Sequence, residues 1–82
     1  MKTPAEMISH ALRFFDHENK MRLGEMVVAA LDLKEDDNVV DRAQDLLNRT
    51  LSEEEAFRIQ TLTRFYFSRI GDSIAGKGVM TL

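Results

Sequence analysis

The chain contains no cysteine and no tryptophan, and it has one proline and one tyrosine in 82 residues. Without cysteine, the protein has no disulfide framework, no thiolate metal site and no thiol nucleophile. Its apolar runs fall far short of the roughly 20 residues that a helix needs to cross a bilayer. The N-terminal residues lack the apolar segment of a secretory signal. We therefore expect a cytoplasmic protein that makes no membrane contact.

The composition that remains is that of a small folded domain. Hydrophobic residues make up 44% of the chain, which is ordinary for a globular protein and too high for a disordered one. A chain of this size buries only a modest core, so its stability has to come from close helix packing or from oligomerisation. We expect residues 1–82 to form a single helical domain, with residues 76–82 as a candidate flexible tail.

The sequence Thr3-Pro4-Ala5-Glu6 predicts the start of a first helix. In this capping box Thr3 accepts a hydrogen bond from the amide of Glu6, and Glu6 reaches back to the amide of Thr3. Pro4 suits the first helical position because its fixed φ is already helical. The apolar stripe that follows at helical spacing consists of Ile8, Ala11, Leu12 and Phe15.

Residues 16–20 leave the next boundary open. This polar stretch is either a turn in which Asp16 caps a second helix, or the exposed part of one helix over residues 4–32, and we favour the turn. Gly24 lies within the second apolar set. It either weakens this helix by about 1 kcal/mol relative to alanine or permits the close approach of a neighbouring helix. The sequence does not decide between these two roles.

Two further helices are predicted downstream. Residues 32–38 are typical of a linker in which Asp36 or Asp37 caps the third helix. Ser52 and Glu55 form a second capping box, which begins the longest helix of the chain, and this helix is expected to end at Gly76. With no convincing strand pattern, these segments predict an all-α fold, a small bundle of three to four helices with the last helix longest.

Charge is distributed unevenly along the chain. Residues 32–55 carry nine acidic and three basic side chains, whereas residues 56–82 carry four basic and one acidic. Most such charges form solvated faces or complement the helix dipoles. The sharper hypothesis is that the acidic segment binds a basic surface, with Asp36, Asp37 and Asp41 as the candidate contacts.

The helix expected over residues 52–76 carries more apolar side chains than a small bundle easily buries. Most of them fall on one arc that suits a core. Phe57 and Phe65 fall outside this arc, about two turns apart, with Arg58 and Arg69 as a rim, and aromatic residues beside arginine are enriched at protein interfaces. The alternative is that both phenylalanines pack within the chain, against another helix or residues 79–82.

No metal site is predicted from the histidines. His10 and His17 lie about 10 Å apart along a helix axis, which is too far for them to share one ion. Glu6 and His10 lie one turn apart and would supply two ligands, but no third ligand is specified. We expect neither a metal ion nor a cofactor.

Enzyme activity is also not expected. The glutamates at 53–55 lie at a helix N-terminus, which favours their ionised form and so disfavours a proton donor. The serines have no nucleophile motif around them. Residues 76–78 resemble a glycine-rich loop only in composition, because a phosphate loop must lead into a helix and these residues follow one.

The favoured function is a small non-enzymatic protein-binding adaptor or inhibitor that acts through a helical face, alone or as a homodimer. The alternative is a transcription-associated or nucleic-acid-binding regulator that acts as a dimer. A helix-turn-helix over residues 23–49 would begin its second helix with acidic residues, and the last helix begins with three glutamates, which repel phosphate. We therefore expect a protein partner or a second copy of the chain, and no direct binding of nucleic acid by the monomer.

Overall fold

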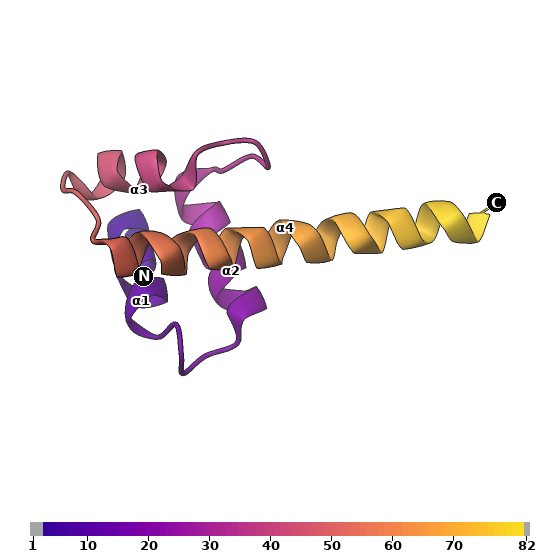
Figure 1. The fold of residues 1–82 in the computed structure, drawn as a ribbon, viewed down its shortest axis with the longest axis horizontal. Coiled ribbons are helices and arrows are strands. Elements are labelled where there is room, and N and C mark those ends of the chain that lie inside the picture. The colour runs from indigo at the N-terminus through magenta and orange to yellow at the C-terminus, as the bar shows by residue number, and fades with distance from the viewer. Residues whose placement is uncertain (1–2, 82) are drawn as a thin grey trace.

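The computed structural model describes the backbone of residues 3–81 and the side chains of residues 3–70. The described chain forms four helices and no strand: α1 (Pro4–Arg13), α2 (Lys20–Leu31), α3 (Val39–Leu47) and α4 (Glu53–Thr81). The prediction of an all-α bundle whose last helix is longest is confirmed. Figure 1 shows α4 crossing the other helices with its N-terminal half and extending beyond them.

Both predicted capping boxes are present. Glu6 donates its amide to Thr3 Oγ1 at 3.2 Å, and Glu55 donates its amide to Ser52 Oγ at 3.1 Å. The return bond at α4 runs from the Ser52 amide to Glu55 Oε1 at 3.0 Å. At α1 the return bond differs from expectation, because the Thr3 hydroxyl rather than its amide donates to Glu6 Oε1. Local sequence therefore determines where these two helices begin.

The caps of the two middle helices differ from those expected. Residues 14–19 form a turn, so residues 4–32 hold two helices, and Asn19 rather than Asp16 caps α2 by accepting from the Arg22 amide at 3.1 Å. Asn38, and neither Asp36 nor Asp37, caps α3 by accepting from the Asp41 amide at 3.2 Å. An asparagine side chain serves this purpose as well as an aspartate does.

The helix ends have different causes. Asp32 and Asn48 adopt left-handed conformations with φ of 48° and 56°, and they end α2 and α3. The expectation that the last helix ends at Gly76 is wrong, because α4 continues to Thr81. A glycine lowers helix stability by about 1 kcal/mol without preventing the helix, and no proline follows it. The flexible tail was predicted for residues 76–82. The side chains of these residues, and the whole of residue 82, lie outside the described part of the structure.

The core lies where α1 and α2 meet the N-terminal half of α4. Its fully buried side chains of largest volume are Ile8, Leu23, Val27, Ile59 and Leu62. The buried hydroxyl of Thr63 bonds back to the carbonyl oxygen of Ile59 at 3.1 Å, so this polar group needs no partner from another helix. The apolar faces of the amphipathic helices thus converge on one cluster.

Gly24 allows α2 and α4 to pack closely. A Cβ atom at this position would lie 2.6 Å from the carbonyl oxygen of Leu62 and 3.0 Å from Cβ of Tyr66. Both distances are shorter than van der Waals contact, so any larger residue would push the helices apart. Of the two roles left open by the sequence, the structure supports close approach.

Candidate protein-binding surface

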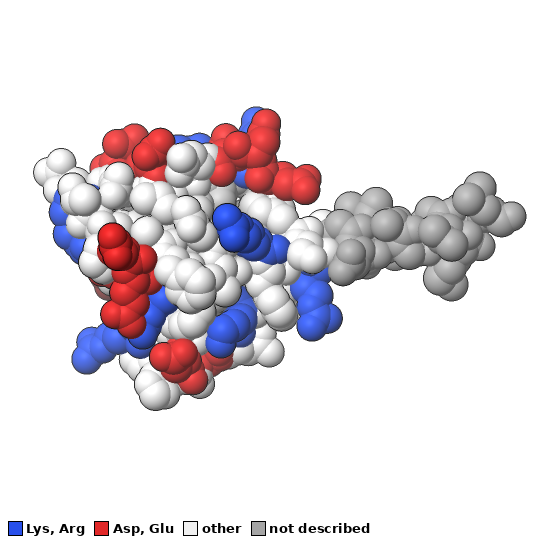
Figure 2. All heavy atoms as spheres, viewed as in Figure 1, with Lys and Arg blue, Asp and Glu red and all other residues white. Residues whose placement is uncertain are grey.

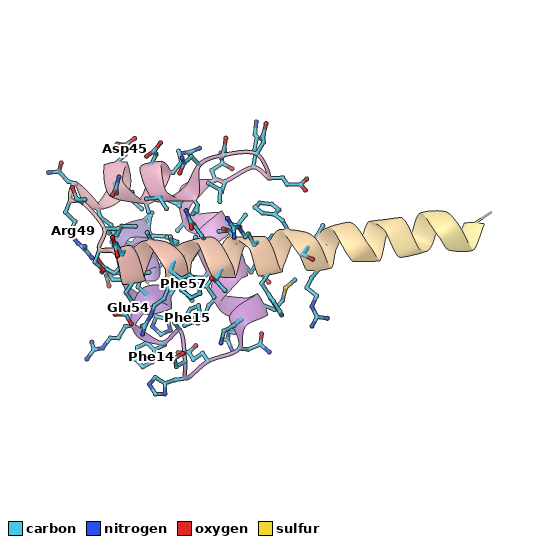
Figure 3. All side chains as sticks on the ribbon, in the orientation of Figure 1. Phe14, Phe15, Asp45, Arg49, Glu54 and Phe57 are labelled. Atoms are coloured by element: carbon cyan, nitrogen blue, oxygen red, sulfur yellow. The ribbon has the colours of Figure 1, made fainter. Side chains whose placement is uncertain are left out.

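Phe57 is the most exposed large hydrophobic residue among the described side chains, at 62% of its surface. Among the described side chains, Leu46 on α3 is the other exposed large hydrophobic residue, at 38%. Phe57 lies on the half of α4 that crosses the other helices (Figure 3). Residues 57, 61 and 65 follow one another at helical spacing and form one stripe along α4. Single exposed apolar side chains are common on protein surfaces, so Phe57 is a candidate binding residue because of the stripe that it shares with Phe65.

Phe65, at the other end of this stripe, is half-buried. It lies in a shallow depression beside Asn19, Lys20 and Met21 at the start of α2. The Arg69 guanidinium lies over the Phe65 ring, 4.9 Å from its centroid. Phe65 therefore lies partly against another helix, while Arg69 keeps the rim position that the sequence predicts for it.

Arg58 lies on the side of α4 that faces α1. Its guanidinium donates to the carbonyl oxygen of Leu12 at 2.8 Å and to Glu54 Oε1 at 2.8 Å. It also lies 5.4 Å from the centre of the Phe15 ring and 3.6 Å from a carboxylate oxygen of Asp16. Because its donors have partners within the chain, Arg58 joins α1 to α4 and is not a free rim residue beside Phe57.

The acidic segment forms one edge of the molecule. Acidic side chains gather along α3 and the loop before it (Figure 2). Asp36 and Asp41 are exposed there. Asp37 is half-buried and accepts hydrogen bonds from the amide of Lys34 at 2.9 Å and from Arg42 at 3.1 Å. Of the three predicted contact residues, Asp36 and Asp41 are thus free of ion pairs within the described side chains, whereas Asp37 shapes the loop.

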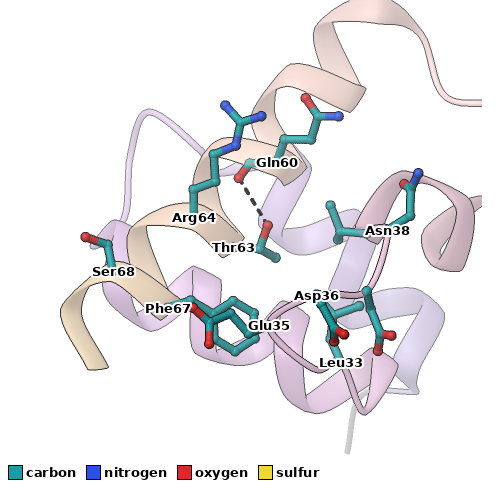
Figure 4. Close-up of a pocket in the computed structure, with 11 residues that line it drawn as sticks. Leu33, Glu35, Asp36, Asn38, Gln60, Thr63, Arg64, Phe67 and Ser68 are labelled. Carbon is teal, nitrogen blue, oxygen red and sulfur yellow. Dashed lines mark hydrogen bonds between the residues drawn. The ribbon is translucent and has the colours of Figure 1, made fainter. Parts of the chain in front are cut away.

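A groove of about 600 Å³ separates the α2–α3 loop from α4, and we call it the loop groove (Figure 4). The sequence gives no signal for it, because its two walls lie far apart along the chain. One wall contains Asp36 and Asp37, two of the predicted acidic contact residues, and the other wall is the part of α4 around Arg64. Its lining consists of Leu33, Glu35, Asp36, Asp37, Asn38, Val39, Gln60, Thr63, Arg64, Phe67 and Ser68.

The histidines take part in local contacts. His10 Nε2 lies 2.8 Å from Glu18 Oε2, and the His10 ring stacks on Phe14 with the ring centroids 4.6 Å apart. Glu6, the sequence-predicted neighbour of His10, bonds to Thr3 instead. Within the described side chains, no three His, Cys, Asp or Glu residues gather closely enough to hold a metal ion.

One ion pair explains the perturbed pKa values of the described residues. Arg49 donates two hydrogen bonds to the Glu55 carboxylate, at 3.0 and 2.9 Å. Together with the Ser52 amide, these bonds lower the pKa of Glu55 from its usual 4.5 to about 2, and the same pair raises the pKa of Arg49. This shift favours an ionised, structural carboxylate, which is unsuited to donating a proton.

No family model, curated protein or solved structure matches this chain. Over the described residues, no helix combines the length and the apolar character that crossing a membrane requires.

Proposed function

We propose that this protein is a small, non-enzymatic, cytoplasmic adaptor or inhibitor that binds another protein molecule through the solvent-facing side of α4. The observation that carries the proposal is the 62% exposure of Phe57 on a helix whose opposite side is anchored in the core. Ile59 and Leu62, on that opposite side, are fully buried. The helix therefore presents Phe57 on a preorganised support, and docking would cost little conformational entropy.

Burial of the Phe57 side chain in an interface would stabilise a complex. A phenylalanine carries about 150 to 250 Å² of surface, and its complete burial is worth about 2 kcal/mol. Most of that gain is unused in the free protein because Phe57 remains largely in water. Aromatic side chains of this kind are frequent anchors at the centres of protein interfaces.

Nucleic-acid binding receives less support from the positions of the basic residues. Arg58 is bonded to Leu12 and Glu54 within the chain. Arg64 and Arg69 are exposed, but they are five residues apart and so point to different sides of α4. The first turn of α3 contains Asp41, whose charge opposes phosphate. We therefore favour a protein partner.

The test compares Phe57→Ser with the matched control Leu46→Ser, which removes the exposed apolar residue of α3 instead. Both side chains are exposed, so we expect both variants to retain the helical circular dichroism of the parent. Affinity capture from the native host, read by quantitative mass spectrometry, is expected to lose its specific partner with Phe57→Ser and to keep it with Leu46→Ser. Equal capture by the parent and Phe57→Ser would contradict the proposal.

A further inference from the structure

The loop groove and Phe57 belong to one continuous surface. Phe57, Gln60 and Arg64 follow one another at intervals of three and four residues, so they share one side of α4. Gln60 and Arg64 also line the loop groove. Phe57 therefore lies about one turn of α4 before Gln60, the first residue of α4 that lines the groove.

The loop groove is lined mostly by polar side chains, with a small apolar part at its floor and carboxylates on its outer rim. Leu33 and Val39 contribute buried apolar surface, and Phe67 is half-buried against the core. Glu35 and Asp36 stand exposed on the loop side. Neither carboxylate forms an ion pair with any described side chain. The groove thus offers contact to an apolar group that is accompanied by a positive charge.

The α4 side of the groove supplies a positive charge. Arg64 is exposed and forms no ion pair with any described side chain. Its side chain extends along α4, away from Glu35 and Asp36 across the groove (Figure 4). Phe57 lies two turns before Arg64 on the same side of the helix. One side of this chain therefore contains an apolar group with a cation and, further along α4, a groove with an apolar part at its floor and two carboxylates on its rim.

We propose that this surface binds a second copy of the chain in a two-fold symmetric dimer. In a two-fold interface the same patch meets itself, so each patch must contain both halves of the complementarity. Phe57 of each copy packs on the apolar floor of the other copy's loop groove, and Arg64 of each copy faces Glu35 and Asp36 of the other. This inference rests on the proposed use of Phe57 for binding and names its partner.

A charge exchange tests the dimer directly. Sedimentation equilibrium over a concentration series gives the dissociation constant of the parent, of Arg64→Glu, of Asp36→Arg and of the double variant. Arg64→Glu places like charges opposite each other, and Asp36→Arg replaces one of two attractions by a repulsion, so each single change is expected to weaken the dimer, Arg64→Glu at least about tenfold. The double variant restores one opposite pair while Glu35 remains, and it is expected to dimerise more tightly than Arg64→Glu alone. Arg64 and Asp36 are both exposed, so unchanged circular dichroism verifies that the fold is intact.

Apolar substitutions complete the experiment. Phe57→Ser is expected to give a monomer, and Leu46→Ser to leave the parent dimer unchanged. A parent that remains monomeric throughout its soluble range overturns the dimer, as does a dimer that is insensitive to Arg64→Glu and Asp36→Arg. A monomer whose capture of a different host protein still depends on Phe57 overturns this inference alone. If neither self-association nor capture of a host protein depends on Phe57, the proposed function is overturned as well.

Discussion

At the scale of single residues, Gly24 determines how closely two helices pack. Glycine is a poor helix former, and alanine in its place would normally stabilise a helix by about 1 kcal/mol. Here the added methyl group would lie 2.6 Å from the Leu62 carbonyl oxygen, which belongs to the backbone of α4 and has little freedom to move. The packing cost and the helix preference therefore oppose each other, and packing has the larger effect.

We predict that Gly24→Ala destabilises the protein. Overpacking a close contact typically costs 1 to 3 kcal/mol, so a net loss of about 1 kcal/mol remains after the gain in helix preference. Urea denaturation followed by circular dichroism measures this loss as a lower free energy of unfolding. Glu25→Ala, at the exposed neighbouring position, is the control and should change that free energy little. A Gly24→Ala variant more stable than the parent would show that the helices separate without cost.

At the scale of elements, the junction of α3 and α4 is held by charge. The Glu55 carboxylate caps α4 through the Ser52 amide and binds Arg49, which follows the left-handed end of α3. Its pKa of about 2 lies below its usual 4.5 because these bonds favour the ionised form. A lowered carboxylate pKa stabilises the fold above pH 4.5, and this contribution disappears as the pH falls towards about 2.

We predict that Glu55→Gln makes the free energy of unfolding depend less strongly on pH in the acidic range. Glutamine keeps a capping oxygen but loses the charge, so the variant should be less stable than the parent at neutral pH. Urea denaturation between about pH 6 and pH 2 should show this difference shrinking as the pH falls. Glu53→Gln is the control, because Glu53 lies in the same helical turn and pairs with no described side chain. A difference between parent and Glu55→Gln that stays constant with pH would refute the role of the Arg49 pair.

The helix starts show which parts of the fold local sequence predicts. Thr3 and Ser52 were predictable caps because each capping box lies within four consecutive residues. Asn38 was not predictable, since Asp36 and Asp37 are equally suitable capping residues by type. The choice depends on the loop, where Asp37 accepts hydrogen bonds from Lys34 and Arg42 and is no longer available as a cap. Contacts of this kind appear only when the chain is folded.

At the scale of the whole molecule, Arg58 joins the beginning of the chain to its last helix. The carbonyl oxygen of Leu12 belongs to the last turn of α1, where carbonyl groups lack partners within the helix. Arg58 supplies a donor to it from 46 residues further along the chain. Arg58 also lies near Phe15 and Asp16, so the turn that follows α1 contacts α4 as well.

We predict that Arg58→Met lowers the free energy of unfolding by about 1 to 2 kcal/mol, because methionine retains the apolar stem and removes the hydrogen-bond donors. Chemical denaturation provides the measurement. Arg22→Met, at an exposed position of α2 whose side chain has no partner among the described residues, should stay within about 0.5 kcal/mol of the parent. Equal stability of the two variants would mean that Arg58 does not join α1 to α4 in solution.

The candidate site was predictable only in part, because some of its features depend on contacts between distant segments of the chain. The exposure of Phe57 follows from its place on the side of α4 opposite the core, which helical periodicity predicts from one segment. The inward position of Arg58 and the loop groove depend on segments far apart in sequence. Periodicity gives the direction of a side chain from its own helix axis, but it does not say which neighbouring helix lies in that direction.

The contribution of α4 to the core also has a consequence for synthesis. Ribosomes make α1, α2 and α3 before the segment that supplies Ile59 and Leu62. Until then Leu23 and Val27 lack the side chains that bury them, so a nascent chain has no complete core to fold around. Resistance to protease should therefore appear only after residue 62 has left the exit tunnel. The cell must keep the earlier helices soluble until that moment.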